Sequence, residues 1–92
     1  MAKRVYFIAH GGIVQGVGFR MYTRARARVH GVSGWCRNTR DNNVEGEAQG
    51  REEVVEEFLK DVAEGPRLAT VAYVSREERE VVDGEASFVI RD

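Results

Sequence analysis

The chain is poor in the residues that stabilise small secreted proteins and that hold metal ions. Its 92 residues include one cysteine, Cys36, one proline and two histidines, His10 and His30. A single cysteine excludes an internal disulfide and is typical of a reducing compartment, so we expect a cytoplasmic protein. The two histidines stand far apart, and neither has a second ligand at the spacing of a metal motif. We therefore expect no bound metal and no other cofactor.

Long apolar runs are also absent. No segment approaches the roughly 20 apolar residues that a membrane-spanning helix needs, and the apolar run behind Lys3 and Arg4 is too short for a signal peptide. Hydrophobic residues make up 42% of the chain and charged residues 32%, which is the composition of an ordinary globular protein. We expect one domain over residues 1–92, monomeric and without a membrane partner.

The net charge of −1 conceals an uneven distribution. Nine Lys and Arg stand against three Asp and Glu up to Arg51, whereas five stand against twelve after it. A positive N-terminal half can speed the approach of a small anion. The same pattern arises if two helices carry outer faces of opposite charge, and both interpretations stay open.

Periodicity predicts the elements of the first half. Bulky β-forming residues predict a strand over residues 3–10. A helix is expected over 21–30, with Tyr22, Ala25 and Val29 on its buried stripe and Gly31 at its end. Two further strands are expected over 35–39 and 44–49, joined by an Asp- and Asn-rich turn at 40–43.

The second half continues with a helix and two strands. The helix is expected over residues 52–63, with one apolar face made by Val54, Val55, Phe58, Leu59 and Val62. The strands are expected over 68–75 and 86–91, with a charged loop or strand extension between them. The resulting βαββαβ order predicts an α+β fold, the ferredoxin-like plait, in which an antiparallel sheet carries both helices on one face. The fold by itself does not predict a function.

The turn between the first strand and the first helix has the composition of an anion site. Its sequence is Val-Gln-Gly-Val-Gly-Phe-Arg over residues 14–20. Glycines let backbone N–H groups converge, and a helix start adds unpaired N–H groups and a positive dipole end. Arg20 adds a forked cation that can bind two oxygens of a phosphoryl group. The P-loop and dinucleotide motifs both fail, because Val17-Gly18 stands where Lys-Ser/Thr is required and Met21 where the third glycine is required.

Two longer segments resemble the acylphosphatases, small enzymes that hydrolyse the carboxyl–phosphate bond of acyl phosphates. One is the run from Gly12 to Arg20, which matches the family pattern Gly-x-Val-Gln-Gly-Val-x-Phe-Arg. The other is Gly34 to Asn38, which matches Gly-Trp-x-x-Asn. Gly65-Pro66 and the closing Phe88-Val89-Ile90 also fit, so the resemblance covers nearly the whole chain.

The resemblance implies a function for particular residues. Arg20 is expected to bind the substrate phosphoryl group together with backbone N–H groups of the preceding loop, formed by Gln15, Gly16, Val17, Gly18 and Phe19. Asn38 is expected to orient the attacking water, and a small-molecule acyl phosphate is the expected partner. One departure from the family is an apparent extra residue at His10-Gly11-Gly12, which a β-bulge near the site can absorb.

Other functions compete with this one. A non-catalytic plait that binds phosphate or RNA has the same order of elements, and Gly16-Val17-Gly18-Phe19 partly matches the RNA-recognition signature. However, Gln15 replaces the basic residue of that signature and Val17 replaces an aromatic that stacks on a base, so we expect no nucleic-acid partner. A third alternative is a module that serves a larger maturation enzyme or a regulatory partner.

Overall fold

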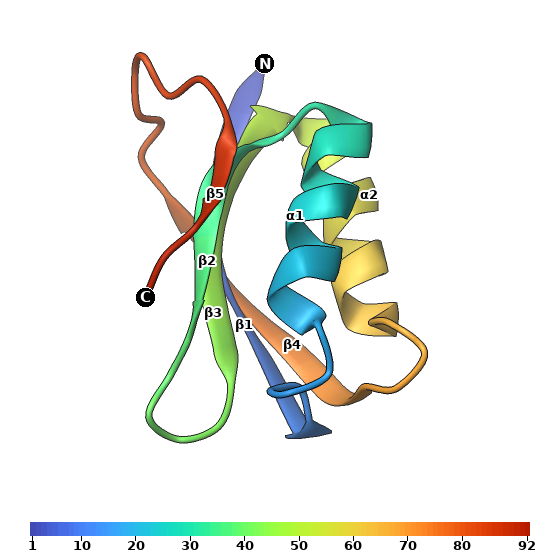
Figure 1. Cartoon of the computed structure of the whole chain (residues 1–92). Coiled ribbons are helices and arrows are strands. Elements are labelled where there is room, and N and C mark those ends of the chain that lie inside the picture. The colour runs from blue at the N-terminus through green and yellow to red at the C-terminus, as the bar shows by residue number, and fades with distance from the viewer.

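The computed structural model describes all residues, 1–92, as a five-stranded sheet with two helices on one face (Figure 1). The strand order across the sheet is β4-β1-β3-β2-β5. In chain order the elements are β1 (Ala2–Ile13), α1 (Phe19–His30), β2 (Ser33–Asn38), β3 (Val44–Arg51), α2 (Glu52–Glu64), β4 (Thr70–Arg79) and β5 (Phe88–Ile90). Neither helix is long and apolar enough to cross a membrane.

The predicted ferredoxin-like plait is confirmed. Neighbouring strands are antiparallel except for β2 and β5, which run parallel, so the sheet is mixed. Strands β4 and β5 lie at opposite edges of the sheet, and the loop between them crosses its helix-free side (Figure 1). The charged segment after residue 75 is partly strand, since β4 continues to Arg79.

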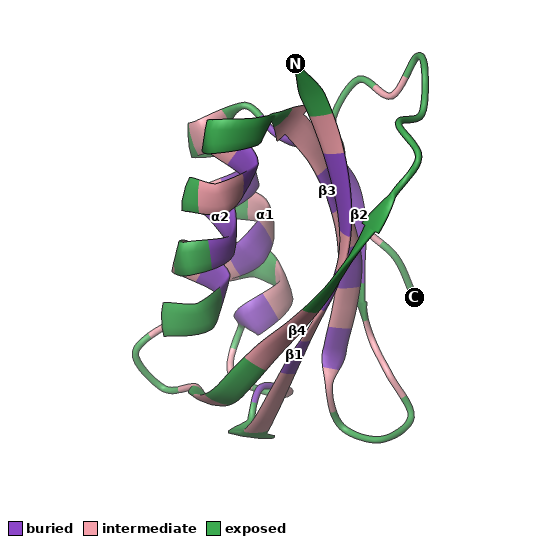
Figure 2. Ribbon diagram, turned by 180° about the vertical axis from the view of Figure 1, so that it is seen from behind, coloured by how far each residue is buried: buried purple, intermediate pink, exposed green.

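The apolar core lies between the sheet and the helices. Alternation along β1 places Val5, Phe7 and Ala9 on the helix side, and all three are buried. Phe58 of α2 packs between Phe7 and Phe88, with ring centroids 5.8 and 5.7 Å apart. Figure 2 shows the buried positions on the sides of the helices that face the sheet. The expected apolar face of α2 is confirmed, with Val54 half-buried and the other four buried.

The predicted buried stripe of α1 is wrong. Ala25 and Val29 are exposed, Val29 by 66%, and the buried residues are Phe19, Thr23 and Ala27. The helix begins at Phe19 rather than at residue 21, and this large aromatic side chain fixes which face turns inward. Burial of Phe19 outweighs burial of Val29, because the apolar area removed from water is larger for phenylalanine.

The expected β-bulge is confirmed at the end of β1. The pairing with β4 shifts register between His10 and Gly11 and again between Gly11 and Ile13, so Gly12 has no partner residue in β4. A side chain at Gly11 would place its Cβ 2.3 Å from the carbonyl oxygen of Thr70. Glycine is therefore required at this close approach, and the bulge sets the direction in which the chain leaves the sheet toward α1.

A buried arginine holds the loop between β4 and β5 onto the helix-free side of the sheet. Arg4 is only 3% exposed and donates hydrogen bonds to Glu47 and Gln49 of β3 and to both carboxylate oxygens of Glu85, at 2.8 and 3.2 Å. Gln49 also exchanges two 2.8 Å hydrogen bonds with the backbone of Val82. These anionic and polar partners compensate for the free-energy cost of burying the Arg4 charge.

We predict that Arg4→Met destabilises the fold by about 3 kcal/mol, because two carboxylates then lose their buried counter-charge. The measurement is urea unfolding followed by circular dichroism. The matched control is Arg51→Met, which removes an exposed ion pair with Glu53 and should change the stability by less than about 1 kcal/mol. Equal effects of the two substitutions would contradict the prediction.

Candidate active site

The loop between β1 and α1 turns on two glycines in left-handed conformation. Gly16 has φ of 74° and Gly18 has φ of 75°, values that side chains other than hydrogen rarely tolerate. Gly18 occupies the N-cap position of α1 and, lacking a side chain, provides no cap hydrogen bond. The start of the helix is therefore left without the side-chain acceptor that usually satisfies it.

The backbone N–H groups of this loop lack acceptors within the protein. The first intrahelical bond of α1 runs from the Tyr22 N–H to the Gly18 carbonyl oxygen at 2.9 Å. None of the N–H groups of Gln15 through Met21 donates to a protein oxygen. Several adjacent free donors at the positive end of a helix dipole form a site for an anion.

A cavity of about 210 Å³ opens between this loop and the end of β2. Arg20 and Asn38 both line it, so the structure brings the two sequence motifs together. Gly16, Gly18 and Phe19 contribute the loop side, and the remaining wall is made by Val14, Met21 and Ile90. The side chains of Arg20 and Asn38 make no hydrogen bond or ion pair within the protein, which leaves both free for a ligand. Met21 and Ile90 reach the cavity because α1 packs against β5. The two sequence motifs do not predict this packing.

Gln15 and Val17 occupy the loop but do not line the cavity. The Gln15 side-chain amide donates to the carbonyl oxygens of Thr39 at 2.9 Å and Asn43 at 2.8 Å. Both acceptors belong to the turn that follows Asn38, so Gln15 fastens the loop to the β2–β3 hairpin. Val17 packs against the apolar core. These two side chains therefore hold the loop in place rather than form the cavity wall.

Cys36 is buried next to the backbone of Arg20, and its thiol is unreactive. Its side chain is fully buried, and its Sγ lies 3.8 Å from the carbonyl oxygen of Arg20. Burial raises the pKa of this thiol to about 12, and the nearby cations Arg20 and Arg24 offset only part of that effect. The thiol is therefore protonated at neutral pH and cannot serve as a nucleophile.

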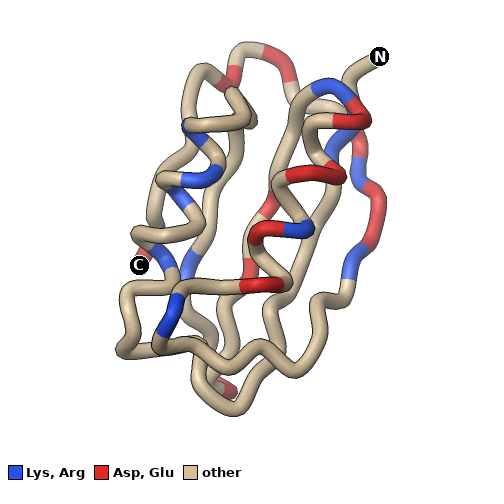
Figure 3. The backbone as a smooth tube through the Cα atoms, turned by 90° about the vertical axis from the view of Figure 1, so that its right-hand side faces the viewer, with Lys and Arg blue, Asp and Glu red and all other residues tan.

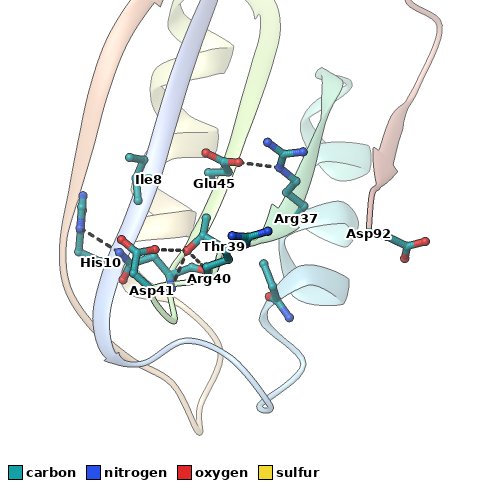
Figure 4. Close-up of a pocket in the computed structure, with 10 residues that line it drawn as sticks. Ile8, His10, Arg37, Thr39, Arg40, Asp41, Glu45 and Asp92 are labelled. Carbon is teal, nitrogen blue, oxygen red and sulfur yellow. Dashed lines mark hydrogen bonds and ion pairs between the residues drawn. The ribbon is translucent and has the colours of Figure 1, made fainter.

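A larger cavity, of about 690 Å³, lies on the helix-free side of the sheet and reaches Asn38 from there (Figure 4). Its lining is almost wholly polar, and the Arg37 Nε pairs with a Glu45 oxygen within it at 2.6 Å. His10, at its edge, stacks on Tyr73 with ring centroids 4.2 Å apart and forms a 2.8 Å hydrogen bond with Ser75. No group of three or more His, Cys, Asp and Glu side chains is placed to hold a metal ion.

Comparison with known proteins agrees with the motifs. The family model described as acylphosphatase matches residues 5–90. The chain belongs to the acylphosphatase family. An acylphosphatase from Bifidobacterium longum is 45% identical over 75 residues, which cover 82% of this chain and 77% of that protein.

Solved structures of the acylphosphatase family show the same architecture. The acylphosphatase from Bacillus subtilis superposes with a TM-score of 0.88 at 30% identity and full coverage of both chains. The one from Coxiella burnetii gives a TM-score of 0.89 at 31% identity, covering 98% of this chain and 93% of that one. These relatives establish that the chain is an acylphosphatase enzyme, a hydrolase of acyl phosphates.

We predict that Gln15→Leu lowers kcat about tenfold while KM changes less, because the hairpin that carries Asn38 loses its two bonds to the loop and small misplacements are costly in catalysis. Steady-state kinetics with benzoyl phosphate measure both parameters. A control is Gln49→Leu, since that residue bonds to Val82 on the helix-free side and lies outside both cavities. A kcat close to that of the unsubstituted protein would remove Gln15 from the positioning of Asn38.

Proposed function

We propose that the chain cleaves the carboxyl–phosphate bond of acyl phosphates in the 210 Å³ cavity, with Arg20 and the loop backbone binding the phosphoryl group and Asn38 orienting water. One observation carries the proposal. A cation, several N–H groups and a side-chain amide adjoin a single cavity, and none of them has a partner in the protein. The proposed phosphoryl ligands are Arg20 and the backbone of Gln15, Gly16, Val17, Gly18 and Phe19. Of these, Arg20, Gly16, Gly18 and Phe19 line the cavity, whereas Gln15 and Val17 contribute N–H groups of the same loop that lack acceptors.

Electrostatic preorganisation supplies most of the catalytic effect in this scheme. The Arg20 guanidinium presents parallel N–H donors to two phosphoryl oxygens. The first-turn N–H groups of α1 add fixed dipoles that need no rearrangement during the reaction. Phosphoryl transfer has a loose transition state, so binding its charge and positioning its reactants suffices without a strong protein base.

Asn38 supports the approach of water from the end of β2. Its side-chain oxygen can accept a hydrogen bond from the water, and its NH2 group is a donor that has no partner in the protein. The water oxygen forms a bond to phosphorus while the bond from phosphorus to the carboxyl oxygen breaks. The proton of the water passes to a phosphoryl oxygen of the substrate, and the products are a carboxylate and inorganic phosphate.

The leaving group limits the range of substrates. A carboxylate is a stable anion, so its departure needs no general acid, and no Asp, Glu or His lines the proposed cavity. An alkoxide leaving group from an ordinary phosphate monoester would need such an acid. The proposed scheme therefore favours activated phosphates and requires no metal ion.

We also propose a domain organisation, an oligomeric state, a compartment and a partner for the protein. Residues 1–92 act as one domain, as a monomer in the cytoplasm, on a small-molecule acyl phosphate and without a nucleic-acid or membrane partner. The single cysteine supports the reducing compartment. The loop enters a helix rather than a central strand, unlike the base-stacking strands of RNA-binding plaits.

We predict that the protein releases phosphate from benzoyl phosphate in the presence of a chelator and leaves p-nitrophenyl phosphate almost intact. Arg20→Gln should lower kcat/KM about a hundredfold or more, as the loss of a preorganised oxyanion donor does elsewhere. Spectrophotometry follows both substrates. The control is Arg26→Gln, which removes the same charge from the side of α1 that faces α2. Activity that disappears with the chelator would overturn metal independence.

A separate prediction concerns Asn38. Asn38→Ala should lower kcat at least tenfold while the inhibition constant of inorganic phosphate changes little, because the proposed partner of Asn38 is water and not phosphate. Initial rates with and without added phosphate give both quantities. Equal losses in turnover and in phosphate affinity would assign Asn38 to phosphate binding instead.

A further inference from the structure

The arginines of α1 lie on two different sides of the helix. Arg26 faces α2, where its Nε pairs with the Asp61 carboxylate at 2.7 Å. Three others, Arg20, Arg24 and Arg28, form no ion pair and no side-chain hydrogen bond. We call these three the arginine row. Figure 3 shows the contrast between the two helices, since α1 carries only positive charges and α2 mostly negative ones.

The arginine row runs along the side of α1 that faces β5. Its members are spaced four residues apart, so they share one side of the helix and span about 12 Å along its axis. Arg20 lines the proposed phosphate cavity together with Ile90. Arg28 lines a separate cavity of about 220 Å³ together with Ser87 and Phe88, at the beginning of β5. The row therefore follows β5 from its end to its start.

This charge is uncompensated within the protein. Like charges four residues apart weaken a helix by roughly 0.2–0.5 kcal/mol per pair, and α1 contains no acidic residue. Six of the other nine arginines pair with carboxylates, namely Arg4, Arg26, Arg37, Arg51, Arg76 and Arg79, whereas Arg40, Arg67 and Arg91 form no ion pair. An unpaired row that begins at the ligand cavity is thus available to an external anion.

The arginine row also extends toward the side of the cavity on which the acyl leaving group would lie. The attacking and leaving oxygens lie roughly in line across phosphorus, so a water held by Asn38 directs the acyl group away from the end of β2. Strands β2 and β5 run parallel, with Cys36 opposite Ile90 and Gly34 opposite Phe88. Arg28, beside Phe88, is therefore at the far end from Asn38, and Arg24 lies between them.

We propose that the arginine row binds a second negative charge on the acyl half of the substrate, so that the protein prefers acyl phosphates whose acyl group is itself anionic. This inference rests on the proposed function and adds a substrate class to it. Arg24, one turn beyond Arg20, is the first cation that such a group meets. Its guanidinium suits a carboxylate or phosphate, because either can accept two parallel N–H donors.

The test compares two substrates that differ in one charge. The measured quantity is kcat/KM for benzoyl phosphate and for 4-carboxybenzoyl phosphate at low ionic strength. The unsubstituted protein should prefer the carboxylated substrate about fivefold, the range of an exposed ion pair, and added salt should reduce the preference. Arg24→Gln should bring the ratio close to one, chiefly by slowing the carboxylated substrate.

Arg26→Gln is the matched control, because it removes the same charge from the opposite side of the same helix and should leave the ratio unchanged. Arg28→Gln should narrow the ratio to an intermediate value. Absence of a preference in the unsubstituted protein, or a preference that survives Arg24→Gln, would overturn the role of the row while leaving the proposed function intact. Failure to hydrolyse either substrate would overturn the proposed function itself.

Discussion

The candidate site depends on the bridge between the Gln15 side chain and the β2–β3 hairpin. The phosphate loop belongs to the chain segment that leaves β1, whereas Asn38 ends β2, and no strand pairing joins the two at this point. The Gln15 amide connects them by donating to the carbonyl oxygens of Thr39 and Asn43. A neutral amide suits this task, because it bridges two carbonyl groups without bringing a further charge to the candidate site.

The bulge at the end of β1 contributes to the same arrangement. A regular strand would continue along β4, but the two register shifts and the unpaired Gly12 turn the chain toward the start of α1. Gly16 and Gly18 then complete the turn in conformations that few other residues adopt. The geometry of the candidate site is thus determined by backbone constraints, and Arg20 and Asn38 are the residues with polar side chains that line its cavity.

Much of the fold and of the candidate site could be predicted from the sequence, because the patterns that indicate them lie in short segments of the chain. The apolar face of α2, the order of the elements and the meeting of the two motifs follow from periodicity and from resemblance. The buried face of α1 could not be read in the same way. Thr23 and Ala27 are weakly apolar whereas the exposed Val29 is strongly apolar, so a periodicity argument favours the wrong side.

The bridging role of Gln15 could not be predicted from a local pattern either, since its two acceptors lie 24 and 28 residues further along the chain. Trp35 is buried on the helix-free side of the sheet, under the guanidinium groups of Arg37 and Arg91.

The burial of the Cys36 thiol beside Arg20 has a consequence for the exposure of the protein to oxidants. Peroxides and electrophiles attack the thiolate, and access to solvent decides which cysteines they reach. Cys36 meets neither requirement, because it is fully buried and its pKa is raised to about 12. A sulfur atom can thus lie 3.8 Å from the carbonyl oxygen of Arg20 without presenting a reactive thiolate, and Cys36 packs there as a small apolar group.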